Sequence, residues 1–207
     1  DPNRWGMDIL IVGNTGGCGG LVLYVDGTAY PVRNEKNPND PVFTARLLKE
    51  TIDSVTIEFT ARRVGPKETP YTVYIRSSAV AGRADSPVEV YIEGGTPGQT
   101  IELGIVLNAL PEETFFIDKD AGIMGLWGFQ QPEIGWIGTG IVFPPDRSLI
   151  VDEQADEHRV VLDYRTGESL HYHIQGDWLR GHRFSRCPGK QEWLNTLKKT
   201  ADKANLK

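Results

Sequence analysis

The chain has 207 residues, a formal net charge of −6 and an isoelectric point of about 5.3. Proteins that bind the nucleic-acid backbone normally carry a basic patch and a high isoelectric point, so this acidic balance argues against a nucleic-acid partner. Apolar residues make up 39% of the chain and 23 glycines add to them, which predicts a folded domain. No apolar stretch approaches the roughly 18 residues that span a bilayer, so we expect no membrane partner.

The length fits one large β domain, and we expect a single sandwich-type domain over 1–207. The sequence begins at Asp1 without a methionine, and it contains no signal peptide. This start is compatible with an absent leader or upstream segment, so that the chain would be the C-terminal part of a longer domain.

Alternation of apolar and polar residues at every second position is the dominant pattern. In chain order, the sequence predicts a strand at 8–12 and a hairpin formed by 21–25 and 28–32. Further alternating strands are expected at 55–61, 71–76, 88–93, 101–105, 160–164 and 170–174. These segments are short and rich in β-branched or aromatic residues, as half-buried strands require.

Turn residues separate the predicted strands. Asp26-Gly27, Gly94-Gly95 and Thr166-Gly167 mark reversals of the chain. Because these links are too short for helical crossovers, we expect the strands that they join to be antiparallel neighbours. An all-β fold follows, either a sandwich or a curved open sheet.

Only the C-terminus has a clear helical pattern. Trp193, Leu197 and Ala201 recur at helical spacing, and Pro188 is suitably placed near the start. The sequence predicts a terminal amphipathic helix over about 188–205, docked on the sheet so that it covers an edge.

The glycine-rich segment 13–20 follows the first predicted strand and suggests a nucleotide-binding loop. Such a loop needs a helix directly after the glycines, whose N-terminus holds the phosphates. Residues 21–25 are instead typical of a strand, so we expect the glycines to allow a tight bend or a close backbone approach.

The two cysteines, Cys18 and Cys187, lie far apart in the sequence. Two distant cysteines do not define a disulfide, and we expect two unpaired thiols. Without a clustered histidine pair they do not indicate a structural zinc site either, so we predict no metal and no cofactor.

Glycines alternate with other residues in the segment 135–140, which contains Trp136. Glycines inside a strand leave space on the face that they occupy. A tryptophan beside that space can stack on a sugar ring, although a core tryptophan packed over the glycines is the better interpretation of this segment alone.

Histidine and arginine are concentrated near the C-terminus. Alternation places His171 and His173 on one face of a strand and Tyr172 on the other. Asp177, Trp178, Arg180, His182 and Arg183 follow. An anion site is the better functional interpretation of this cluster, because arginine binds carboxylates bidentately and histidine moves protons near neutral pH. A solvated strand edge is nearly as good an interpretation, and a metal site a weaker one.

Several motifs occur in a characteristic order. They are Trp5-Gly6-Met7-Asp8-Ile9-Leu10, the glycine-rich segment, Gly135-Trp136-Ile137-Gly138-Thr139-Gly140, Pro144-Pro145, Gly176-Asp177-Trp178 and the terminal helix. This order resembles a bacterial domain family of formerly unknown function from polysaccharide-degradation gene clusters. The resemblance spans nearly the whole chain, which corresponds to the C-terminal part of a typical member. The charged stretch Leu179–Arg183 departs from the small neutral residues that family members tend to have there.

The resemblance implies a galactose-mutarotase-like β-supersandwich, a periplasmic or extracellular location and, for some members, dehydratase activity on unsaturated uronic-acid oligosaccharides. From the residues we assign candidate roles for an elimination beside a uronate carboxylate, which needs a base, a carboxylate clamp and an acid. The candidates are His173 or His171 as base, Tyr172 or Tyr164 as acid, Arg180, Arg183 and His182 for the carboxylate, and Trp136 and Trp178 as stacking platforms.

Two other hypotheses remain open. The domain could bind an acidic oligosaccharide without catalysis, which needs only an aromatic platform. Alternatively, the chain could be one piece of a larger sandwich, with an upstream fragment of the same protein as its partner; exposed apolar faces would then be expected.

Overall fold

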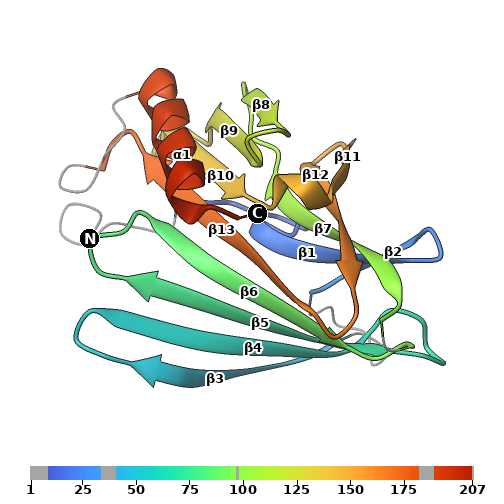
Figure 1. The fold of residues 1–207 in the computed structure, drawn as a ribbon. Helices are drawn as coiled ribbons and strands as arrows, with labels where there is room; N and C mark the ends of the chain where they lie inside the picture. The colour runs from blue at the N-terminus through green and yellow to red at the C-terminus, as the bar shows by residue number, and fades with distance from the viewer. Residues whose placement is uncertain (1–8, 34–40, 97, 182–188, 207) are drawn as a thin grey trace.

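The computed structural model describes residues 9–33, 41–96, 98–181 and 189–206 as two antiparallel sheets and a C-terminal helix (Figure 1). The strands are β1 (Cys18–Val25), β2 (Thr28–Pro31), β3 (Val42–Glu50), β4 (Ser54–Val64), β5 (Tyr71–Val80), β6 (Asp85–Glu93), β7 (Thr100–Asn108), β8 (Thr114–Asp118), β9 (Ile123–Phe129), β10 (Trp136–Val142), β11 (Ser148–Glu153), β12 (Glu157–Arg165) and β13 (Ser169–Trp178). A 3-10 turn covers Pro145–Arg147, and the helix α1 covers Lys190–Ala204.

The smaller sheet has five strands in the order β11-β12-β7-β1-β2, and the larger has eight in the order β3-β4-β5-β6-β13-β10-β9-β8. The predicted antiparallel sandwich with a C-terminal helix is thus confirmed. Within the described residues, no helix is both long and apolar enough to cross a bilayer.

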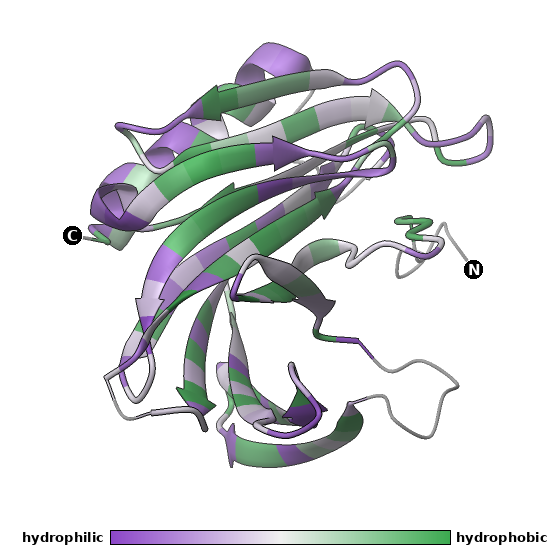
Figure 2. Cartoon of the chain, turned by 90° about the vertical axis from the view of Figure 1, so that its right-hand side faces the viewer, coloured by the Kyte–Doolittle hydropathy of each residue, from purple (hydrophilic) through white to green (hydrophobic). Residues whose placement is uncertain are grey.

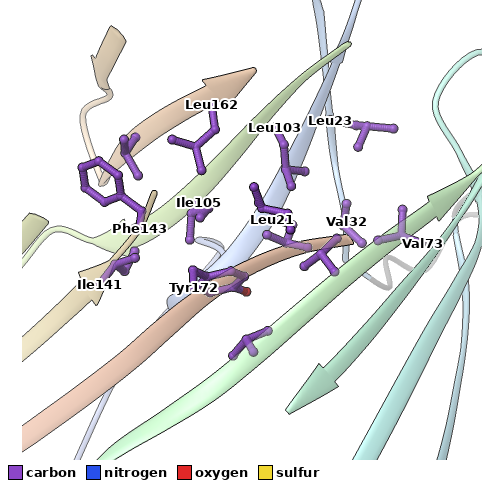
Figure 3. Close-up of a cluster of buried hydrophobic side chains, with 14 of the residues drawn as sticks. Leu21, Leu23, Val32, Val73, Leu103, Ile105, Ile141, Phe143, Leu162 and Tyr172 are labelled. Carbon is purple, nitrogen blue, oxygen red and sulfur yellow. The ribbon is translucent and has the colours of Figure 1, made fainter. Parts of the chain in front are cut away.

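The core lies between the two sheets. Figure 3 shows Leu21 and Leu103 of the smaller sheet meeting Ile141 and Tyr172 of the larger one, and all four are at most 3% exposed. Several strands contribute every second residue, as β7 does with Ile101, Leu103, Ile105 and Leu107, which explains why period-two alternation identified so many of them. Figure 2 shows hydrophobic and hydrophilic residues alternating as green and purple bands along many of the strands.

Helix α1 packs on the outer face of β9, β10 and β13, so it covers a face and not the expected edge (Figure 1). Trp193 and Leu197 fill the space over the strand glycines. A Cβ atom at Gly138 would lie 2.6 Å from the Trp193 ring, and one at Gly140 would lie 2.8 Å from Leu197. The glycines of β10 therefore accommodate the protein's own helix.

Two predicted connections are different in the structure. Gly94-Gly95 and Thr166-Gly167 carry the chain from the larger sheet to the smaller one and back, so the strands that they join are not paired. The strands on either side of each link bury their apolar faces in the core that the two sheets share. An alternating strand can therefore belong to either sheet. The Asp26-Gly27 hairpin is confirmed, with Val25 opposite Thr28.

The strand predicted at 8–12 is wrong over its described residues, 9–12, which form no strand. Ile9 and Leu10 pack against the core without sheet pairing, and β1 begins only at Cys18.

Candidate functional site

Strand β13 carries most of the predicted site residues, and its pleat divides them between two faces. Tyr172 points into the core, whereas His171, His173 and Gln175 lie on the outer face of the larger sheet. The two histidines thus lie on one face, as predicted. The neighbouring strand β6 provides the side chains that surround each of them.

His173 forms a pair with Asp85 at the start of β6. Its Nδ1 atom lies 2.7 Å from Asp85 Oδ2, and both side chains are nearly buried. An ionised carboxylate accepts a hydrogen bond from Nδ1–H and thereby leaves Nε2 as the unprotonated nitrogen. This arrangement of a base and its orienting carboxylate is common at catalytic sites.

Arg83 completes this cluster. Its Nη2 atom lies 2.5 Å from Asp85 Oδ2. Burial by itself would raise the pKa of Asp85, but hydrogen bonds from Arg83 and His173 outweigh burial and hold that pKa below its ordinary value. The same contact with Asp85 raises the pKa of Arg83, although burial opposes it. Asp85 is therefore negatively charged at neutral pH.

A pocket of about 290 Å³ adjoins the pair, between the turn before β6 and helix α1. Its wall consists of Gly82, Arg83, Ala84, Asp85, Gln175, Thr196, Lys199, Thr200 and Lys203. Three of these residues are cationic and one is anionic. The pocket therefore offers a positively charged, concave space lined by Asp85, the acid that pairs with His173.

His171 has different surroundings. It is exposed and lies opposite Glu89, which accepts hydrogen bonds from Ser169 Oγ at 2.7 Å and Arg76 Nη1 at 3.1 Å. Arg76 in turn contacts the buried Glu58 at 2.9 Å. This row of alternating charges neutralises itself across the strands, so His171 adjoins a compensated surface.

The two candidate acids, Tyr172 and Tyr164, are both in the core. Tyr172 donates to the Gly19 carbonyl at 2.7 Å. Tyr164 donates to the Glu168 carbonyl and accepts from the Ile92 amide at 2.9 Å. Burial raises the pKa of Tyr164 to about 12 and raises that of Tyr172 further. The structure brings neither hydroxyl to the outer face where the histidines lie.

Arg180 lies just after the C-terminal end of β13. Arg180 donates to the carbonyls of Pro132 and Glu133 at 2.9 and 3.0 Å. From His173, the strand runs on for five residues to Trp178, a span of roughly 17 Å, so Arg180 is remote from the His173 pair. His182 and Arg183 lie outside the described residues.

The candidate stacking residues are half-buried. Trp136 stacks on Trp127, with ring centroids 6.4 Å apart, and meets the edge of Phe129. Trp178 packs against the core and donates from Nε1 to the Ile134 carbonyl at 2.7 Å. Trp136 thus packs in the cluster beneath α1, whereas Trp178 packs on the core between the sheets, and both residues remain partly exposed.

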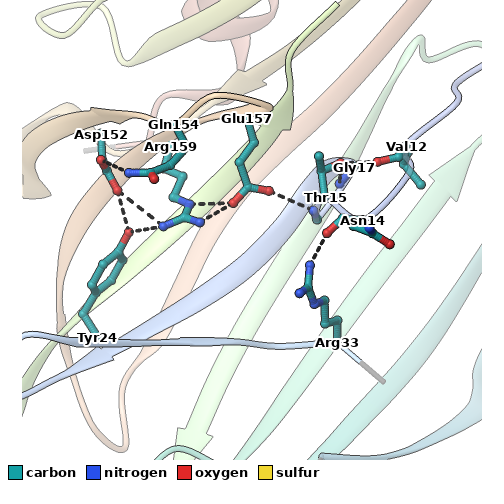
Figure 4. A network of polar contacts seen from close by, with 11 residues as sticks. Val12, Asn14, Thr15, Gly17, Tyr24, Arg33, Asp152, Gln154, Glu157 and Arg159 are labelled. Carbon is teal, nitrogen blue, oxygen red and sulfur yellow. Dashed lines mark hydrogen bonds and ion pairs between the residues drawn. The ribbon is translucent and has the colours of Figure 1, made fainter. Parts of the chain in front are cut away.

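The glycine-rich segment is anchored on the outer face of the smaller sheet (Figure 4). Glu157 accepts from the Gly16 amide at 3.1 Å, and Arg159 connects Glu157 to Tyr24 and Asp152. A Cβ atom at Gly20 would lie 2.2 Å from the Gly16 carbonyl oxygen. The expected close backbone approach is therefore present, and strand β1 follows the segment.

Cys18 is a free, partly buried thiol, and Cys187 lies outside the described residues. No group of three or more histidine, cysteine or acidic side chains within the described part of the chain is arranged to hold a metal ion.

Sequence reasoning found His173 but missed its partners. Asp85 and Arg83 precede it by about 90 positions, and only the pairing of β6 with β13 brings them together. Lys199 and Lys203 were visible as the polar side of the predicted helix, but the face on which the helix docks was not predictable.

Comparison with known proteins gives one matching family and several solved structures with partial similarity. The profile of a family described as a domain of unknown function (DUF4861) matches residues 2–207. No curated protein matches the sequence. A protein provisionally assigned as a kojibiose phosphorylase from the human microbiome is 8% identical, with a TM-score of 0.57 over 89% of this chain and 24% of that chain.

Two further structures are similar at lower scores. An aldose 1-epimerase, provisionally assigned, from Klebsiella pneumoniae subsp. pneumoniae is 10% identical, with a TM-score of 0.44 over 91% of this chain and 65% of its own. A GH36 α-galactosidase from Geobacillus stearothermophilus is 12% identical, with a TM-score of 0.37 over 78% of this chain and 30% of its own. The chain thus spans less than two thirds of each of these proteins, and the likeness to the phosphorylase shows a shared fold.

Proposed function

The chain belongs to the DUF4861 family, and we propose that this member is a carbohydrate-active enzyme of the lyase or dehydratase type. Its substrates would be unsaturated oligosaccharides that contain uronic acid, met in the periplasm or outside the cell during polysaccharide degradation. One observation carries the proposal: the His173–Asp85 pair adjoins a pocket with three cationic side chains.

The chemistry would be an elimination next to the uronate carboxylate. His173 Nε2 takes the proton from the carbon, the C–H electron pair forms the new C=C bond, and the C–O bond on the adjacent carbon breaks. The proton on His173 then passes to the departing oxygen, which leaves as water or as a sugar hydroxyl. Asp85 holds the imidazole in the required tautomer and stabilises its charged form.

Three considerations support this assignment. The motif order resembles a family with oligosaccharide dehydratases among its members. The fold is shared with a protein assigned to carbohydrate chemistry. An elimination next to a carboxylate needs a base and a nearby cation, and His173 of β13 is paired with an acid whose pocket is also lined by lysines of α1.

The test is a mass and ultraviolet absorbance assay on a panel of uronate-containing oligosaccharides. We expect a product lighter by one water or a new unsaturated-uronate absorbance, and a loss of about 10²–10⁴-fold in rate for His173→Asn. His171→Asn is the matched variant on the same face and should retain most activity. If His171→Asn loses activity and His173→Asn keeps it, the base has been assigned wrongly.

A non-catalytic carbohydrate-binding role is the alternative, and the partly accessible Trp136 ring favours it. Sugars commonly stack on such rings. In that case the oligosaccharides bind without turnover, Trp136→Ala weakens binding, and His173→Asn has no effect.

A further inference from the structure

The pocket next to the His173–Asp85 pair has more positive charge than its own acid neutralises. Arg83 pairs with Asp85, whereas Lys199 and Lys203 face the pocket from successive turns of α1. Within the described residues, no ion pair or hydrogen bond involves either lysine. Two ammonium groups therefore remain available to a ligand.

A buried amide in the same wall also lacks a partner. Gln175 is 3% exposed, and its Oε1 accepts from Thr200 Oγ1 at 2.8 Å. Its Nε2 group is buried and has no hydrogen-bond partner among the described residues. A buried donor without a partner costs about 1–3 kcal/mol, so such groups in native proteins usually meet water, an ion or a ligand.

We propose that this pocket is the subsite for the uronate carboxylate. The proposal rests on the proposed function, because it places the carboxylate beside the base that acts on the adjacent carbon. Gln175 Nε2 donates a hydrogen bond to one carboxylate oxygen, and Lys199 and Lys203 supply the positive charge. Arg83 stays bound to Asp85 and separates that acid from the incoming anion.

The size and position of the pocket fit this assignment. At about 290 Å³ it lies at the small end of ligand sites, which suits one sugar residue with its acid group. Asp85 belongs both to the pocket wall and to the pair with His173, so a sugar in the pocket would lie next to the acid that holds the base.

The assignment also explains the role of α1. Trp193 and Leu197 fix the helix on β10, and Lys199 and Lys203 on its last two turns line the pocket. The helix that closes the outer face would thus also select acidic sugars.

The experiment is a calorimetric titration of the full chain with D-glucuronate, with D-glucose as the neutral match. We expect D-glucuronate to bind, glucose not to bind, and affinity to fall as salt rises. The double variant Lys199→Gln/Lys203→Gln should weaken binding about tenfold. Lys198→Gln removes an exposed lysine of the same helix that is not part of the pocket wall, and it should bind as the wild type does.

Gln175→Glu tests the buried amide with a nearly isosteric side chain, and we expect it to abolish binding. Equal binding of glucose and glucuronate, or full affinity in the lysine double variant, would overturn the subsite. His173→Asn separates the two proposals, because it should lose turnover and keep glucuronate binding. Charge-dependent binding without turnover in the wild type would refute the lyase and leave the subsite standing.

Discussion

At the scale of single residues, the surroundings of a candidate catalytic side chain distinguish it more clearly than its residue type does. His173 and His171 are two positions apart, yet one meets a nearly buried carboxylate and the other a self-neutralising row of charges. Tyr172, between them, is part of the core. The sequence was sufficient to separate the two faces, but the partner of each histidine depended on the register of β6 against β13.

Asp85→Asn should lower stability in a pH-dependent way. The folded pKa of Asp85 lies below its unfolded value, so its contribution is complete above the unfolded pKa of about 3.9 and is lost as pH falls through the folded pKa. We expect a loss of about 1–2 kcal/mol at pH 7 that disappears in strong acid. Urea unfolding of both proteins between pH 2 and pH 8 measures this difference, and a constant gap across the range would contradict the account.

Tyr172→Phe should affect stability and leave chemistry intact. The variant loses the hydrogen bond to the Gly19 carbonyl, which costs about 1 kcal/mol and lowers the melting temperature by a few degrees. Turnover should stay within about twofold of the wild type at a temperature where both are folded. A large loss of rate without a loss of stability would restore Tyr172 as a catalytic acid.

At the scale of elements, glycines determine where the helix docks. Gly125, Gly138 and Gly140 of β9 and β10 leave the space that Trp193 and Leu197 fill. The sequence indicated both the glycine strand and the amphipathic helix. It did not indicate that they pack together, because nothing local distinguishes space for a helix from space for a sugar ring.

Gly138→Ala tests this packing. Its Cβ would overlap the Trp193 ring, so we expect a loss of about 1–3 kcal/mol in urea unfolding. Gly176→Ala on the neighbouring strand is the matched control, because its Cβ meets only the Gly138 carbonyl oxygen, at 3.8 Å. Equal effects of the two variants would show that α1 does not depend on the space over Gly138.

Connections were the least predictable part of the fold. The strands were predictable because burial of one face produces an apolar–polar alternation that is visible in the sequence. The links after β6 and β12 looked like hairpin turns, but a short turn can equally lead to the opposite sheet of a sandwich. Of the three predicted turn links, only Asp26-Gly27 joins strands of one sheet, and there both turn residues have positive φ angles, 50° and 75°.

At the scale of the whole molecule, the larger sheet extends past the smaller one. Figure 1 shows β3, β4 and β5 fanning out beyond the five-stranded sheet. Leu47 and Phe59 on this part of the sheet are 56% and 38% exposed. An apolar surface of this kind is the feature that the hypothesis of a larger sandwich expects, and it offers a site for apolar probes.

Phe59→Ser should therefore reduce the binding of a hydrophobic dye to the native chain without lowering stability by more than about 1 kcal/mol. Leu149→Ser removes a similarly exposed side chain from β11 and serves as the control. Fluorescence titration with the dye at constant protein concentration gives the comparison. Equal dye binding by the wild type and both variants would show that this surface is covered in solution.

The central claim is that His173 and Asp85 act as one catalytic unit on an acidic sugar. The most direct measurement is the rate of water loss, followed by mass spectrometry, for His173→Asn, Asp85→Asn and the double variant. Because the two residues serve one proton transfer, we predict that the double variant is no slower than His173→Asn alone. Full activity in either single variant, or losses that multiply in the double variant, would contradict the claim.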